Sequence, residues 1–199
     1  MPDRLLGPVL GFDTSAAHCA AAVVRGDEVL AHRREEMSRG QAERLLPLVA
    51  EVLADAGLGW SDLAAVGVGT GPGNFTGIRI AVAAARGLAL SLGVPAVGVS
   101  ATEAAAHGTP RPCRVVVPLR GGEVAWEDFP RENAGPRLAT ADALPPGPPP
   151  VVPRWPLAVS IARVAGQRAA DGAQPRPAPV YLRPADAAPP REAPPEILA

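Results

Sequence analysis

A glycine-rich break between two apolar segments dominates the middle of this chain. Residues 64–93 read AAVGVGTGPGNFTGIRIAVAAARGLALSLG. Val66 and Val68 alternate with glycine, which is typical of the end of a buried strand. Glycine and proline at residues 71–73 favour a tight turn, and from Thr76 onward apolar residues recur at three- and four-residue steps, which predicts a helix. The stretch is therefore a strand, a glycine turn and a helix.

The backbone N–H groups of such a turn can hold a phosphate or another anion at the start of the helix. The spacing here is G-x-G-x-G with no Gly-Lys-Ser or Gly-Lys-Thr after it, so it matches neither a dinucleotide fingerprint nor a P-loop. A tight strand-to-helix connection and a vestigial anion or nucleotide turn both stay open. The residues of that candidate turn are Asp13, Thr14, Ser15, Gly71, Gly73, Asn74 and Thr76. Asn74 or Thr76 is also the expected helix N-cap.

Three antiparallel strands are predicted at the start of the chain. Val9–Asp13, 18–24 and 29–32 are short apolar runs, and polar turns separate them. The first turn carries a carboxylate and two hydroxyls at residues 13–15. These groups either satisfy the backbone of the turn or contact phosphate oxygens or a metal-bound water.

Helices and strands then alternate. Residues 41–57 place apolar side chains on one helical face, with Gly57 suited to the position after the helix end. Pro47 lies inside this pattern, so the helix starts near it or kinks there. A strand at 94–99 and a brief helix through Ala106 follow. The order β-β-β-α-β-α-β-α predicts an α/β fold.

The second half of the chain has a different composition. Most of the 25 prolines follow residue 100, and the stretch 144–156 cannot form a regular helix or a central strand. A hairpin is predicted from strands at 114–117 and 123–129, and a helix at 157–170. The resulting division is a first lobe over residues 1–105, a shortened second lobe over 106–183 and a disordered tail over 184–199.

The charge balance argues against direct nucleic-acid binding. The formal net charge is −1 at pH 7, whereas proteins that bind nucleic acid directly normally carry a patch of basic residues on their surface. All 19 basic residues are arginine, so no lysine can form a Schiff base with a substrate.

No metal site or cofactor is expected. His18, His32 and His107 lack the spacing of metal ligands. Cys19 and Cys113 lie far apart in apolar runs, which predicts two buried free thiols. No apolar run approaches the roughly 20 residues of a membrane span, and the start of the chain lacks the features of a signal peptide. A cytoplasmic protein is expected.

Four segments together resemble the bacterial TsaB (YeaZ) family. They are G-F-D-T-S at 11–15, G-x-G-P-G-N-F-T-G-I-R-I at 69–80, R-G-G-E-V-A-W at 120–126 and P-V-Y-L-R at 179–183. The resemblance is dense over residues 9–105 and patchy beyond. It implies a two-lobe fold like those of actin, hexokinase and the Hsp70 ATPase, a ribonuclease H-like α/β architecture, with the second lobe reduced.

The resemblance also implies a function. The family acts in making threonylcarbamoyladenosine at position 37 of tRNAs that read ANN codons. Its members are non-catalytic scaffold subunits that pair with the paralogue TsaD and help to recruit the ATPase TsaE. Alone, such a subunit forms a homodimer, and it meets tRNA only through the complex. The family also carries an older glycoprotease-type label. That activity is not expected here, because the sequence offers neither a metal site nor a nucleophile paired with a base.

The partner surface is expected on the two long predicted helices, because small residues let a second helix approach closely. The residues predicted to contact the partner are Gly77, Arg79, Ala84, Arg86, Gly87, Leu45 and Val49. A rival hypothesis is an ATP-dependent kinase-like or carbamoyl-transferring enzyme that acts through Asp13, Thr14 and the glycine turn. It is disfavoured because Pro118 stands where the superfamily usually has an aspartate, and proline offers neither a carboxylate nor an N–H group. A structural protein without a partner is the third alternative.

Overall fold

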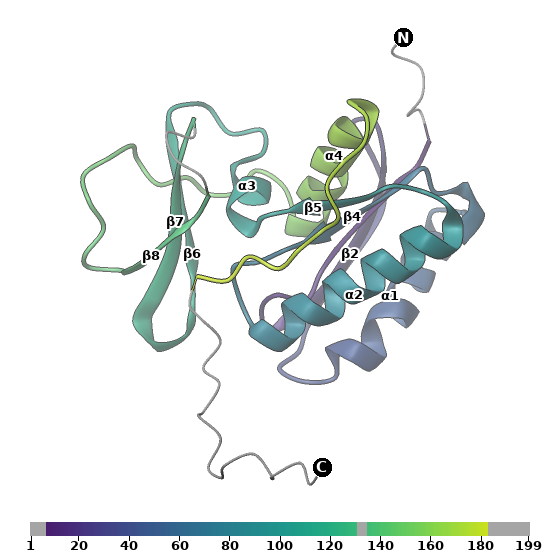
Figure 1. Ribbon diagram of the computed structural model, residues 1–199, viewed down its shortest axis with the longest axis horizontal. Helices are drawn as coiled ribbons and strands as arrows, with labels where there is room; N and C mark the ends of the chain where they lie inside the picture. Colours follow the sequence, from purple (N-terminus) through teal and green to yellow (C-terminus); the bar gives the residue numbers. More distant parts are fainter. Residues whose placement is uncertain (1–6, 131–134, 183–199) are drawn as a thin grey trace, which may run out of the picture.

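The computed structural model describes residues 7–130 and 135–182 (Figure 1). Its strands are β1 (Val9–Asp13), β2 (His18–Arg25), β3 (Glu28–Glu36), β4 (Ala65–Gly69), β5 (Ala96–Val99), β6 (Cys113–Pro118), β7 (Glu123–Phe129) and β8 (Arg137–Thr140). Its α-helices are α1 (Gln41–Asp55), α2 (Phe75–Leu92), α3 (Ala101–Ala106) and α4 (Leu157–Ala170). The predicted disordered tail, 184–199, lies outside the described residues, as does Arg183.

Five strands form a mixed sheet in the order β3-β2-β1-β4-β5. β2 pairs antiparallel with both β1 and β3, whereas β4 pairs parallel with β1 and β5. The three antiparallel strands predicted at the start of the chain are confirmed. Because β1 and β4 are parallel, their carboxyl ends, Asp13 and Gly69, meet at the same edge of the sheet.

Helices cover both faces of this sheet. α1 and α2 lie side by side on one face, and α4 lies on the other (Figure 1). α4 approaches closely because the strands beneath it carry glycine. A Cβ on Gly11 would lie 2.4 Å from the Ala158 carbonyl oxygen, and one on Gly67 would lie 2.6 Å from the Ala165 Cβ. The prediction placed residues 157–170 in the second lobe, whereas in the structure they pack on the first sheet.

The second sheet is smaller and has the antiparallel order β6-β7-β8. Its first two strands confirm the predicted hairpin, whereas β8 was not predicted. Ala105 and Ala106 of α3 share a small core with Cys113, Val115 and Phe129. Because α3 also contacts α4, it connects this sheet to the first one.

The proline-rich segment 144–156 contains no helix or strand, as expected. Arg114 of β6 holds it in place. The Arg114 guanidinium donates to the Pro145 carbonyl at 2.5 Å and to the two carboxylate oxygens of Asp128 at 2.6 and 2.7 Å. The buried Arg114 side chain therefore fixes the segment to the second sheet, in addition to any backbone hydrogen bonds.

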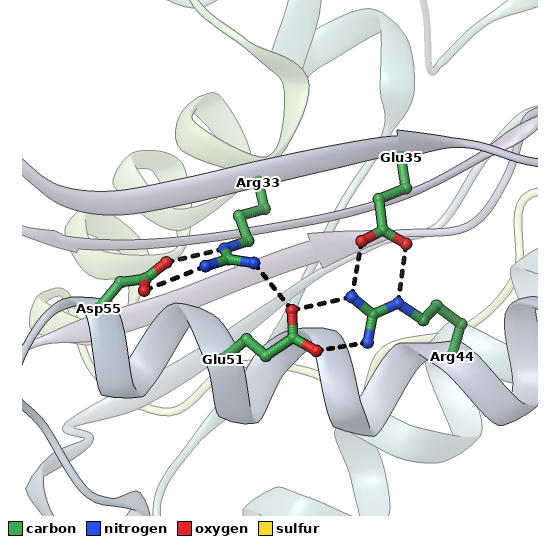
Figure 2. Close-up of polar contacts among 5 residues, drawn as sticks. All are labelled: Arg33, Glu35, Arg44, Glu51 and Asp55. Atoms are coloured by element: carbon green, nitrogen blue, oxygen red, sulfur yellow. Dashed lines mark hydrogen bonds and ion pairs between the residues drawn. The ribbon is translucent and has the colours of Figure 1, made fainter.

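An ion-pair network joins the edge strand β3 to α1 (Figure 2). Arg44 donates to the two Glu35 oxygens at 2.7 and 2.6 Å and to those of Glu51 at 2.6 and 2.8 Å. Arg33 donates to Asp55 at 2.7 and 3.1 Å and to Glu51 at 2.9 Å. Hydrogen bonds from Arg44 lower the pKa of Glu35 and of Glu51. The network holds a strand that has only one neighbour in the sheet.

The ends of the long helices follow local chemistry. α1 passes through Pro47 without ending, and Gly57 follows its C-cap with φ of 66°, as the helix prediction required. α2 begins one residue before Thr76, after its cap Asn74.

α2 is long and apolar enough to cross a membrane by length and composition, with a mean hydropathy of 1.4 over 18 residues. This differs from the prediction that no run approaches such a length. One face of α2, which includes Ile78, Ala81, Val82 and Ala85, packs into the core of the first sheet. A helix of a soluble protein that packs into a core can reach the same length and hydropathy as a membrane span.

Candidate partner surface and the adjoining cleft

The turn after β1 packs directly on the start of α2. A Cβ on Gly73 would lie 2.2 Å from the Ser15 carbonyl oxygen, and one on Gly77 would lie 1.9 Å from that of Thr14. The Thr14 hydroxyl donates to the Gly77 carbonyl at 2.7 Å. Any larger residue would collide with this backbone, so the glycines of the motif serve to join the first hairpin to α2.

Two N–H groups at the junction of the glycine turn and α2 have partners within the chain. The Asn74 N–H donates to the Ser15 carbonyl at 2.5 Å. The Asn74 side chain accepts from the Gly77 N–H at 3.0 Å, which confirms Asn74 as the N-cap. Gly71 adopts φ of 84° against Ile78. These contacts support the tight connection, and an anion or nucleotide role for this turn, including the exposed Thr76, stays a prediction.

Asp13 is fully buried and organises the polar turn. Its Oδ2 accepts from the Ser15 N–H at 2.8 Å and from the Ser15 hydroxyl at 2.9 Å, and it lies 2.8 Å from His18 Nε2. Its Oδ1 is buried beside Gly69 and has no hydrogen-bond partner in the described part of the chain. Serine and histidine thus both bond to the carboxylate, whereas an activated serine nucleophile bonds to the histidine itself.

A cavity of about 390 Å³ opens beside this turn, between the two sheets. Ser15 and His18 line its first-sheet side, and the imidazole and guanidinium of His32 and Arg34 come from β3. The wall from the second sheet is apolar and consists of Val115, Val116, Val117, Pro118 and Leu119. That wall offers no charged side chain to a phosphate group.

α1 and α2 leave an apolar outer surface, which we call the helix ridge: Leu46, Pro47, Ala50, Ala83, Gly87 and Leu90. Leu46 is 45% exposed and Leu90 is 86% exposed. A Cβ on Gly87 would meet nothing within 4 Å, so the α2 backbone is open to an approaching partner at this point.

Three residues predicted for the partner surface are buried, and this corrects the prediction. Leu45, Val49 and Gly77 are buried within the packing of the first sheet. Ala84 is half-buried against the same core. A helical period shows that one face is apolar, but it does not show whether the sheet or a partner covers that face. Of the small residues predicted, Gly87 lies on the exposed ridge.

Arg79 and Arg86, both exposed, contact a later segment of the chain itself, and their predicted contact with a partner stays a prediction. Arg79 Nε donates to the Tyr181 hydroxyl at 2.8 Å, and its Cζ lies 3.7 Å from the centroid of the Phe75 ring. Arg86 Nε donates to the Pro177 carbonyl at 2.8 Å. Both arginines therefore have intramolecular partners along the edge of α2.

Two features of the candidate surface and cleft, His18 and Leu90, were not predicted from the sequence. His18 was considered only as a metal ligand, although its position five residues after Asp13, across a tight hairpin, is a local signal for contact. Leu90 was not singled out, because a single apolar residue on the polar side of a helical pattern is common.

Metal ligands and cysteines form no further site in the described part of the chain. Among residues 7–130 and 135–182, no group of three or more His, Cys, Asp and Glu side chains could hold a metal ion. Cys19 and Cys113 are free and buried, as predicted. Burial raises the pKa of the Cys19 thiol to about 11, so it stays protonated and unreactive at neutral pH.

Sequence comparisons group the chain with proteins of tRNA modification. The family described as "TsaD: tRNA N6-adenosine threonylcarbamoyltransferase" matches residues 28–123. The "tRNA threonylcarbamoyladenosine biosynthesis protein TsaB" of Escherichia coli (strain K12) is 36% identical over 132 residues, which cover 64% of this chain and 57% of that protein. An uncharacterised protein of Mycobacterium bovis is 38% identical over 147 residues, which cover 72% of this chain and 70% of the relative. The chain thus spans little more than half of the E. coli protein.

The solved structures agree with the sequence relatives. YeaZ from Pseudomonas aeruginosa superposes with a TM-score of 0.68 at 27% identity, covering 88% of this chain and 100% of that chain. This likeness and the mixed sheet confirm the predicted α/β fold. The chain belongs to the TsaB (YeaZ) family.

Proposed function

We propose that the chain takes part in tRNA threonylcarbamoyladenosine biosynthesis as a non-catalytic scaffold subunit. It pairs with a TsaD paralogue, helps to recruit the TsaE ATPase, and forms a homodimer when alone. The names of its TsaB relatives and the match to the TsaD family support this pathway. It acts in the cytoplasm and needs no cofactor of its own.

The observation that carries the proposal is the helix ridge. Leu90 is 86% exposed and lies on α2 close to the open backbone at Gly87. Large exposed apolar side chains beside small residues are typical of surfaces that bind another protein. A pair of helices from a partner can pack across α1 and α2 at the usual interaxial distance of about 8–10 Å.

The polar turn and the cleft support a role without catalysis. Asp13 is engaged by Ser15 and His18, and the second-sheet wall of the cleft is apolar. With a formal net charge of −1, the chain has little electrostatic attraction for tRNA. We infer that it meets tRNA only through the assembled complex.

The test is co-elution with the cognate TsaD, measured by size-exclusion chromatography with light scattering. Leu90→Arg places a charge on the ridge and should weaken the pairing at least tenfold, since an unpaired charge in an apolar interface is costly. Val152→Arg is the matched control, because Val152 is 85% exposed but lies in the proline-rich segment. Equal retention of TsaD by both variants would refute the proposed surface.

The alternative of an ATP-dependent enzyme is tested separately. Calorimetry with millimolar ATP and magnesium should give no binding heat for the chain alone. Saturable binding that Asp13→Asn abolishes would favour the enzyme over the scaffold.

A further inference from the structure

Arg163 is a buried cation in the middle of α4. It is 9% exposed, and its NH2 group donates to the Asp27 backbone carbonyl at 2.6 Å. Its Cζ lies 4.1 Å from the centroid of the Trp155 ring. Within residues 7–130 and 135–182, its Nε is buried without a hydrogen-bond partner. A backbone carbonyl and an aromatic face compensate a buried guanidinium only partly, because neither carries a negative charge.

A cavity of about 230 Å³ adjoins this arginine. β1, β2 and the turn before β3 form one side of it, and α4 forms the other. Small residues keep it open: Gly26, Ala162, Gly166 and Ala170 all contribute to its lining. This volume equals that of roughly seven or eight waters, at roughly 30 Å³ each in the liquid, so it suits only a small molecule.

The charged groups around the cavity favour a ligand with a single negative charge. Arg163 supplies the positive charge, and that charge also reaches His107, whose pKa is lowered first by burial and then by Arg163. Asp27 is also a lining residue of the cavity, and its negative charge disfavours a dianion such as phosphate more than a monoanion. The Gln167 side chain, on the rim, can donate or accept a hydrogen bond.

We propose that this cavity binds a small organic carboxylate, whose negative charge the buried Arg163 guanidinium neutralises. Carboxylates match the planar guanidinium fork and form its strongest hydrogen bonds. An unpartnered buried donor is the kind of group that a bound anion would explain. The site lies on the face of the sheet opposite the helix ridge, so it does not depend on the proposed partner.

The experiment is an NMR titration of the isotopically labelled full chain with sodium acetate, at ionic strength kept constant with sodium chloride. Saturable shifts are expected for the amides of Gly26, Asp27 and Gly166, with half-saturation in the millimolar range. Inorganic phosphate at pH 7.5 should give shifts at least tenfold weaker. Glycine, which adds an ammonium group that can reach Asp27, should bind at least as well as acetate.

Two variants assign the binding to this arginine. Arg163→Met should abolish the saturable shifts, whereas Arg154→Gln is the matched control, because Arg154 is exposed and lies over the same Trp155 ring. Ala170→Glu keeps the arginine and places a carboxylate at the exposed rim, so it should compete with acetate even if Arg163→Met fails to fold. The proposal would be overturned by shifts that stay linear with acetate concentration, that chloride reproduces, or that persist in Ala170→Glu. Arg163 would then have only a structural role.

Discussion

At the scale of single residues, two glycines of α2 have opposite roles. Gly77 faces the backbone of the Thr14 turn, where a Cβ would lie 1.9 Å from a carbonyl oxygen. Gly87 lies ten residues further along α2, on the exposed ridge, and has open space around it. The first glycine therefore serves packing within the fold, and the second leaves a surface free.

These two positions give a matched pair of substitutions. Gly77→Ala should destabilise the chain by about 2–3 kcal/mol, because the turn must move to admit a methyl group. Gly87→Ala should stabilise it by up to about 1 kcal/mol, because alanine favours a helix interior over glycine. Urea unfolding followed by circular dichroism measures both changes. A loss of less than about 0.5 kcal/mol for Gly77→Ala would contradict the close packing of the turn.

At the scale of secondary-structure elements, ion pairs to α1 hold the edge strand β3 of the first sheet. β3 has only β2 as a neighbour, and α1 supplies Arg44, Glu51 and Asp55 to the network of Figure 2. Each pair is partly exposed, so its strength depends on salt and on pH.

The pH dependence has a definite sign. The folded state lowers the pKa of Glu51 below its ordinary value of 4.5, chiefly through hydrogen bonds from Arg44. Its contribution to stability is therefore present above about pH 4.5 and is lost as the pH falls through the lowered pKa. Glu51→Gln should reduce the melting temperature at pH 7, and the difference from wild type should shrink toward pH 3.

Glu28→Gln provides the control for this measurement, because Glu28 lies exposed at the start of β3 and outside the network. It should change the melting temperature little at either pH. If the Glu51→Gln difference were the same at pH 3 as at pH 7, the carboxylate would not be the stabilising group.

At the scale of the whole molecule, two connections tie the sheets together. α4 leaves the second half of the chain to cover the first sheet, and α3 packs on both α4 and β6. The second sheet has only a small core of its own, and three strands with so little burial are marginal in isolation. The two sheets should therefore unfold as one unit.

Native-state hydrogen exchange in increasing urea tests this cooperativity. The slowest amides of β1 and β7 should open with free energies within about 1 kcal/mol of each other, as expected for a single cooperative unit. An opening free energy for β7 several kcal/mol below that of β1 would show that the second sheet unfolds independently.

Local chemistry made much of the fold predictable. Turn glycines, an Asn N-cap and apolar periodicity act between residues close in the chain, which is why the glycine turn, the long helices and both hairpins were found from the sequence. β8 has only four residues, Arg137–Thr140, and lacks a strong alternating pattern, so it was not found.

The sequence by itself determined the order and the ends of most elements, because those depend on backbone sterics and on neighbours a few residues away. Only the tertiary structure decided which apolar face is covered. It buried Leu45 and Val49 in the core, left Leu90 exposed, and used Arg79 and Arg86 to hold residues about 90–100 positions later. The physical reason is that a periodic pattern records that a face avoids water, whereas the group that covers it comes from a distant part of the chain.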